Sequence, residues 1–280
     1  MIKKPIKFVI ATLFRAIKRM MNEDGMMVSG HIAFTGFLSL FPFLIFLAAA
    51  AGFLTSPEDI PRIIDFMFKF MPTEVAFAIS PAVTDIVSQK PAGLLTFGFL
   101  GTLWASSTGL ESLRIALNRA YSVPKRRPLW RRRLQSIFFI FFSALVIFFI
   151  SILVVLGPLA WQIIAPILHL GSLQEIIFNL IRYGFSFCLL MGALVVLHKY
   201  LPNRRERIIE YNVLPGAALT TILFLLGGTV FSSFITNFGN YNVAYGSLGS
   251  VIITLIFFYL SAILFIFGAY LNAELKKKDK

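Results

Sequence analysis

The chain has 280 residues, of which 58% are hydrophobic and 14% charged, with a net charge of +13 and a mean hydropathy of +0.81. Because a soluble domain carries about 25% charged residues, this composition excludes a soluble enzyme, a secreted scaffold and a disordered protein. One cysteine, Cys188, excludes an internal disulfide and a cysteine-based metal cluster. Long uncharged runs between clustered charges indicate an all-α, polytopic membrane helix bundle.

The uncharged runs predict six transmembrane helices. The first run, Ile32–Leu54, has 23 residues, which at 1.5 Å per residue is enough to cross a hydrocarbon core of about 30 Å. It is too long for the apolar region of a signal peptide, so we expect it to stay in the protein. The predicted spans are residues 32–54, 91–112, 136–156, 181–200, 213–236 and 247–271.

The third span requires a choice between two arrangements. Leu134–Gln174 has 41 uncharged residues, twice what one crossing needs. It forms either a hairpin of two spans or one span followed by an apolar segment at the membrane interface. Gly157 and Pro158 interrupt the run, and Trp161 beyond them suits a membrane–water boundary. We therefore predict one span followed by an interfacial segment.

The distribution of basic residues predicts the topology. Twenty-two of the 26 lysines and arginines lie in the amino-terminal segment, in the connections after spans two and four, and in the tail. The positive-inside rule places these parts, and both termini, in the cytoplasm of a single membrane domain over residues 1–280. Residues 1–30 then form a cytoplasmic basic segment whose amphipathic helix lies on the inner leaflet. Residues 55–90 form two extracytoplasmic amphipathic helices, either a passive brace or a lid.

The basic connection at residues 125–133 has two interpretations. Its arginines could contact nucleic acid, but no nucleic-acid-binding fold surrounds them. Short basic loops beside spans more simply fix topology and contact anionic headgroups. The predicted partners are therefore membrane lipids with anionic headgroups and not nucleic acid, while the oligomeric state is left open. The candidate headgroup-binding residues are Arg126, Arg127, Arg131, Arg132 and Arg133.

Polar residues inside the predicted spans are the candidates for function. In span two, Ser107, Glu111, Arg114 and Asn118 have spacings that place them on one helix face. Glu111 and Arg114 can pair there, and the face either binds substrate or packs against neighbouring helices. Arg182 has Glu175 within two turns and is expected to snorkel. The candidate substrate-binding residues are Ser107, Glu111, Arg114, Asn118, Arg119, Asn237, Asn240 and Tyr241.

No pattern in the chain predicts catalysis. The three histidines fall on separate predicted elements, and neither a His-Glu-x-x-His motif, a Cys-x-x-Cys motif nor a Gly-rich phosphate loop after a strand occurs. A zinc site would need three or four convergent ligands. We therefore expect no enzyme activity, no metal and no cofactor.

Four blocks of the sequence resemble a known family. They are His31–Pro42, Trp104–Tyr121 with Arg131–Arg133, Tyr200–Asn203, and Asn237–Gly249. In this order they are similar to the YihY/BrkB family of bacterial inner-membrane proteins, and the resemblance covers about residues 8–275. It implies a six-span protein of the bacterial inner membrane.

Members of this family have been labelled virulence factors, ribonucleases and possible lipid transporters. The ribonuclease label finds no metal-binding or acid–base set in this sequence. Helices broken by Gly and Pro around a polar interior favour a transporter. We expect transport of an anionic amphiphile or lipid-like substrate through a polar cavity lined by spans one, two and six. The alternative is a scaffold that recruits a partner or lipid through its basic cytoplasmic loops.

Overall fold

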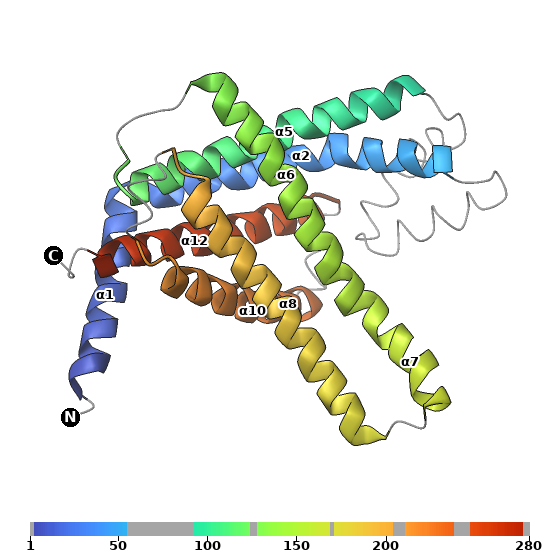
Figure 1. Ribbon diagram of the computed structural model, residues 1–280. Coiled ribbons are helices and arrows are strands. Elements are labelled where there is room, and N and C mark those ends of the chain that lie inside the picture. Colours follow the sequence, from blue (N-terminus) through green and yellow to red (C-terminus); the bar gives the residue numbers. More distant parts are fainter. Residues whose placement is uncertain are drawn as a thin grey trace. The chain divides into compact units, whose positions relative to one another are not determined.

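The computed structural model describes residues 3–54, 92–123, 128–168, 171–203, 211–237 and 247–276, and these residues form helices and no strand. The prediction of an all-α chain is confirmed, whereas the amphipathic helices predicted at residues 55–90 lie outside the described residues. In chain order (Figure 1) the elements are α1 (Lys3–Asn22), α2 (Gly25–Leu54), α5 (Ala92–Ala120), α6 (Leu129–Ser151), the π-helical η2 (Ile152–Leu156), α7 (Gly157–Ile167), α8 (Ser172–Tyr200), α10 (Leu214–Asn237) and α12 (Ser247–Lys276).

Within the described residues, five helical stretches are long and apolar enough to cross a membrane. They are Gly25–Phe43, Leu129–Ile167, Ser172–Tyr200, Leu214–Ser233 and Val251–Lys276, which correspond to predicted spans one, three, four, five and six. The helix of predicted span two, α5, is not among them, because glycine, serine and threonine lower its hydropathy. The count of six spans and the side on which the termini lie stay predictions.

The described helices belong to two compact units. Unit 1 consists of Met1–Asp24, Arg114–Leu225 and Leu264–Lys280, and unit 2 of Gly25–Leu113 and Leu226–Ile263. The boundaries between the units fall within α5, α10 and α12.

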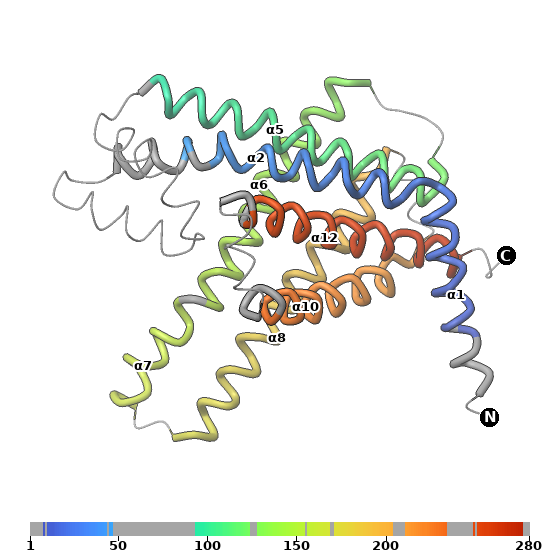
Figure 2. The backbone as a smooth tube through the Cα atoms, turned by 180° about the vertical axis from the view of Figure 1, so that it is seen from behind, coloured from blue at the N-terminus to red at the C-terminus, as the bar shows by residue number. Residues whose placement is uncertain are grey.

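In unit 2, α2 and α5 lie side by side (Figure 2). Their close approach depends on glycines of α5. A Cβ atom on Gly98 would lie 2.7 Å from the backbone nitrogen of Phe46, and one on Gly101 would lie 3.0 Å from Cβ of Pro42. Small residues of this kind let helix backbones pack closely in membranes. The face of span one that includes Pro42 therefore packs against α5.

In unit 1, α6, η2, α7 and α8 form what we call the hairpin. The first three are continuous, and α8 returns after a short connection (Figure 1). The predicted break at Gly157 and Pro158 is therefore absent from the helix. A proline ring clashes with the carbonyl four residues earlier in a regular helix, and the wider turn of η2 directly before Gly157 accommodates it. The returning helix begins at Ser172, before the span predicted from residue 181.

The helix α1 has one buried and one exposed stripe in unit 1. Its buried stripe consists of Thr12, Ala16 and Met20. The exposed stripe is apolar and consists of Ile10, Phe14, Ile17 and Met21. The structure therefore divides the apolar residues of α1 between a buried and an exposed stripe, and contact of the exposed stripe with the inner leaflet stays a prediction.

The first turns of α10 and the last turns of α12 cross closely in unit 1. A Cβ atom on Gly216 or on Gly268 would overlap the backbone of the other helix. The backbone N–H of Gly216 donates to Oδ1 of Asn272 at 2.7 Å, and the hydroxyl of Thr220 donates to the carbonyl oxygen of Leu264 at 3.1 Å. Glycines at the crossing thus bring polar groups of the two helices within hydrogen-bond distance.

Candidate functional site

Arg114, the central residue of the predicted polar face, is completely buried. Its Nε donates to the carbonyl oxygen of Leu201 at 3.1 Å. Its Nη2 donates to the carbonyl oxygen of Arg132 at 3.2 Å and to the hydroxyl of Ser136 at 3.1 Å. Arg114 therefore ties the carboxyl end of α5 to the first turns of α6 and to the turn after α8.

Asn118 and Arg119 hold two further turns of unit 1. Oδ1 of Asn118 accepts a hydrogen bond of 2.9 Å from the backbone N–H of Asn203. Nη1 of Arg119 donates to the carbonyl oxygen of Glu23 at 2.7 Å and lies 3.7 Å from a carboxylate oxygen of Asp24. The side chain of Arg119 is 41% exposed, so it retains surface that a headgroup can contact.

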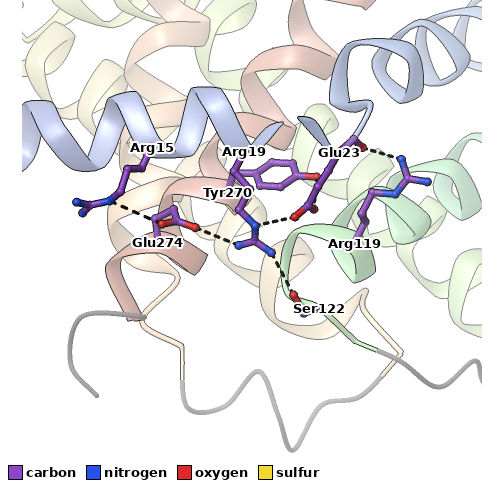
Figure 3. A network of polar contacts seen from close by, with 7 residues as sticks. All are labelled: Arg15, Arg19, Glu23, Arg119, Ser122, Tyr270 and Glu274. Atoms are coloured by element: carbon purple, nitrogen blue, oxygen red, sulfur yellow. Dashed lines mark hydrogen bonds and ion pairs between the residues drawn. The ribbon is translucent and has the colours of Figure 1, made fainter. Parts of the chain in front are cut away.

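Arg19 of α1 connects three parts of unit 1 (Figure 3). Its guanidinium donates to the carboxylate of Glu23 at 2.8 Å, to the carboxylate of Glu274 at 3.4 Å and to the hydroxyl of Ser122 at 3.1 Å. The hydroxyl of Tyr270 donates to the other carboxylate oxygen of Glu23 at 3.0 Å. These contacts fix α1 against the end of α12.

Glu274 is a buried carboxylate near the end of α12. Besides Arg19, it contacts Arg15, whose Nε lies 3.8 Å from Oε2 (Figure 3). Its negative charge is therefore already matched by two arginines of α1.

A buried amide, Asn272, joins α12 to two other segments. Its Nδ2 donates to the hydroxyl of Tyr121 at 3.3 Å and to the carbonyl oxygen of Val213 at 3.1 Å. Burial raises the pKa of the Tyr121 phenol, so this side chain stays neutral. We use the name polar end for the following side chains of unit 1: Arg15, Arg19, Glu23, Arg114, Asn118, Arg119, Tyr121, Tyr270, Asn272 and Glu274.

Sequence reasoning found three members of the polar end. Helical spacing identified Arg114 and Asn118 on one face of α5, and Arg119 was identified by its position where the predicted span leaves the membrane. It missed Tyr270, Asn272 and Glu274, which face this group from another helix. Asn272 and Glu274 were the strongest available signal, since they are the polar residues that end the long uncharged run of α12.

The other predicted substrate-binding residues are distributed differently. Ser107, in unit 2, is buried, and its hydroxyl has no hydrogen-bond partner among the described residues. Glu111 is half-buried in the same unit, and its pairing with Arg114 stays a prediction. Asn237 ends α10, and its side chain is not described. Asn240 and Tyr241 lie outside the described residues.

The predicted headgroup-binding arginines are described in part. Arg131 is exposed, and its guanidinium lies 5.0 Å from the ring centre of Trp130. Arg132 and Arg133 are half-buried, whereas Arg126 and Arg127 lie outside the described residues. Contact of these arginines with lipid stays a prediction.

Potential metal ligands do not gather in the described part of the chain. No three His, Cys, Asp or Glu side chains lie close enough there to hold an ion. His198, a completely buried histidine, has its Nε2 at 3.3 Å from the carbonyl oxygen of Phe265, and its ring packs at a tilt against the ring of Phe265, with 4.6 Å between ring centres. Its surroundings are those of a packed side chain.

Comparison with known proteins identifies the relatives of the chain. It is 31% identical over 259 residues to the putative ribonuclease-like protein YfkH of Bacillus subtilis, and the match covers 92% of each chain. It is 25% identical to a UPF0761 membrane protein of Alteromonas mediterranea, over 94% of this chain and 87% of the relative. A UPF0761 membrane protein of Aliivibrio salmonicida is 26% identical, over 95% of this chain and 84% of the relative.

No solved structure matches the chain. The family model described as Virulence factor BrkB matches residues 16–280. This match includes α2, every later helix and the arginines of the polar end except Arg15. The chain is therefore a membrane protein that belongs to the virulence factor BrkB family.

Proposed function

We propose that the chain transports an anionic amphiphile, a lipid or lipid-like molecule, in the bacterial inner membrane. The path is the polar cavity predicted between spans one, two and six. Ser107 and Glu111 of span two belong to this predicted lining. The buried hydroxyl of Ser107 has no hydrogen-bond partner among the described residues, and this supports the path because buried polar groups rarely lack a partner.

One observation carries the choice of an anionic substrate. Among the described residues, Arg114 and Arg182 are buried arginines of unit 1, whereas Glu274 is a buried carboxylate that Arg15 and Arg19 already contact. Charged residues within membrane helices are costly and are typical of substrate pathways. An excess of buried cations favours a substrate that supplies negative charge.

The second candidate function, a scaffold without transport, is favoured by the polar end. Arg114, Asn118 and Arg19 all bond to groups of the chain itself. Bonds of this kind hold helices together and leave these groups without free capacity unless the contacts change. The scaffold would present Arg119 and Arg131 to an acidic partner or lipid.

Leaflet exchange in liposomes separates the two functions. The purified protein is reconstituted with a trace of fluorescently labelled phosphatidylglycerol, and dithionite bleaches the label in the outer leaflet. The slow phase of bleaching then reports movement from the inner leaflet. We expect it to be faster than in protein-free liposomes, and faster for phosphatidylglycerol than for labelled phosphatidylcholine.

Two exposed cations provide matched variants. Arg119→Gln should slow the exchange of phosphatidylglycerol with little change in melting temperature, whereas Lys18→Gln removes an exposed charge of α1 and should leave the rate unchanged. Equal rates with and without protein would contradict transport and favour the scaffold. Equal acceleration of both lipids would contradict an anionic substrate.

A further inference from the structure

Arg182 lies inside the hairpin and not at its surface. The residue is 6% exposed, although it was expected to snorkel. Its stem lies against Gly157, the first residue of α7. A Cβ atom at position 157 would lie 2.6 Å from Cδ and 3.3 Å from Nη1 of Arg182. The hairpin therefore accommodates this arginine because residue 157 has no side chain.

The guanidinium of Arg182 has aromatic neighbours, and two of its nitrogens have no acceptor among the described residues. Its Cζ lies 4.4 Å from the ring centre of Tyr183 and 5.9 Å from that of Phe178. Nε and Nη1 are buried, and neither has a hydrogen-bond partner among the described residues. A guanidinium always carries its charge and has five N–H donors, and a buried charge is normally paired.

The described residues of the hairpin cannot neutralise this charge. Over residues 129–168 and 171–200 they include one carboxylate, Glu175. Glu175 is exposed and forms no ion pair with Arg182, although the two are within two turns of α8. The described hairpin thus contains a buried cation with unused donors and no anion beside it.

The backbone beside Arg182 is also irregular. The π-helical turn η2 ends immediately before Gly157, and the amide N–H of Ile152 is shared between the carbonyl oxygens of Phe148 and Phe149. Such turns are rare and frequently occur at functional sites. Here the turn is followed directly by Gly157, the residue that leaves space for the side chain of Arg182.

The surroundings of Arg182 indicate the kind of anion. Exposed apolar residues flank it on α8, among them Leu180, Ile181 and Phe185. The rise along α8 from Arg182 to Lys199 is about 26 Å, close to the thickness of the hydrocarbon core. If Lys199 lies at one edge of the hydrocarbon core, Arg182 therefore lies near the other edge, where the headgroups adjoin the acyl chains.

We propose that Arg182 binds the anionic headgroup, a phosphate or a carboxylate, of a membrane amphiphile at the hairpin beside Gly157. The inference deepens the proposed function, on which it rests for the class of substrate, because it names a side chain that recognises the headgroup. The headgroup must enter beside Gly157 to reach the buried Nε and Nη1, which then donate to its anionic oxygens, and the apolar residues of α8 contact the tail.

Trp161 reports lipid at this position, because its ring stacks on Phe178 with 5.0 Å between ring centres. A protein with Trp104→Phe and Trp130→Phe retains this single tryptophan of the three in the chain. In vesicles, lipids with brominated acyl chains quench its fluorescence when they lie beside it. We expect brominated phosphatidylglycerol to bind about tenfold more tightly than brominated phosphatidylcholine, which corresponds to about 1.4 kcal/mol.

Substitutions then test the role of Arg182. Arg182→Gln should remove the preference, and Arg182→Lys should keep part of it. Gly157→Ala keeps the charge but displaces the arginine, so it should reduce the preference and remains informative if Arg182→Gln does not fold. Lys199→Gln, which removes a cation at the other end of α8, should leave the preference unchanged.

The outcomes separate this inference from its alternatives. Equal binding of both lipids to the unsubstituted single-tryptophan protein would overturn it, and so would a preference that survives Arg182→Gln. If excess inorganic phosphate reverses the quenching, the assignment of an amphiphile as the ligand is overturned and the site is one for free anions. If the protein prefers phosphatidylglycerol but does not accelerate leaflet exchange, the proposed transport is contradicted and the role of Arg182 stands. If it accelerates exchange but shows no preference in binding, the role of Arg182 is contradicted and transport stands.

Discussion

Arg114 and Arg182 are both buried in unit 1, but their surroundings differ. Three hydrogen bonds tie Arg114 to two carbonyl oxygens and a hydroxyl, whereas Arg182 has two buried nitrogens without a partner in the described part of the chain. Burial alone therefore does not identify a binding site in this membrane protein. The presence or absence of acceptors distinguishes an arginine that holds helices together from one that is available to a ligand.

The largest change in stability is expected when the side chain of Arg114 is removed. Arg114→Ala leaves two buried acceptors and one partly buried acceptor without their donor, so we expect it to lower the free energy of unfolding by about 3 to 5 kcal/mol. Thermal unfolding in a nonionic detergent, followed by circular dichroism, measures this change. The control Arg131→Ala removes an exposed arginine and should change stability by less than about 0.5 kcal/mol. Equal melting temperatures for the two variants would refute the structural role of Arg114.

Substitution of Arg182 should change the stability in the opposite direction. In the same lipid-free detergent, Arg182→Met replaces a buried unpaired charge by an apolar side chain of similar length. Such replacements are often neutral or stabilise by about 1 to 4 kcal/mol. We therefore expect the melting temperature to stay the same or to rise. A loss as large as that of Arg114→Ala would mean that Arg182 also holds the fold together.

Substitution of Tyr121 tests whether the polar end holds this buried phenol in its neutral form. Because burial raises its pKa, the phenol stays neutral in the folded protein while it ionises near pH 10 in the unfolded chain. Its contribution to stability is therefore complete below pH 10 and is lost as the pH rises further. Tyr121→Phe should cost about 1 kcal/mol at neutral pH through the lost bond to Asn272, yet lose less stability between pH 10 and 11. Identical alkaline losses in both proteins would contradict this view of the site.

The smallest effect is expected at the exposed rim of the polar end. Asp24 lies 3.7 Å from Arg119, and both side chains are largely exposed. Asp24 has a positive φ of 56°, which asparagine tolerates well. Asp24→Asn should therefore cost less than about 1 kcal/mol, and high salt should reduce the difference further. Unfolding at low and high ionic strength measures it, and a large, salt-independent loss would show that the pair is effectively buried.

Much of the fold could be predicted because charge is so unevenly distributed in the sequence. The uncharged runs located α2, α8, α10 and α12, and spacing alone located the amphipathic α1. The continuation of the helix through Gly157 and Pro158 could not be predicted in this way. It depends on the π-helical turn η2, and neither composition nor periodicity distinguishes such a turn from a helix end.

The candidate site was less predictable for a physical reason. Helical spacing placed Arg114 and Asn118 on one face of α5, but their partners are backbone groups far along the chain, the carbonyl oxygen of Leu201 and the N–H of Asn203. Carbonyl and amide groups occur at every residue, so a sequence does not show which of them meet a side chain. Arg182 was misread because the sequence, with Glu175 within two turns, led us to expect a snorkelling side chain. The structure instead buries it against Gly157, a contact between two helices that sequence spacing does not show.

The length of the hairpin has a consequence for the surrounding lipid. The stretch Leu129–Ile167 has 39 residues and is therefore about 58 Å long, nearly twice the hydrocarbon thickness. Even a tilt of about 40°, the upper end of the usual range, leaves it spanning about 45 Å. The bilayer must thicken around the hairpin, or the apolar tip with Ile163 and Ile167 must enter the headgroup layer. We expect either form of hydrophobic mismatch to perturb the order of the lipids beside Arg182.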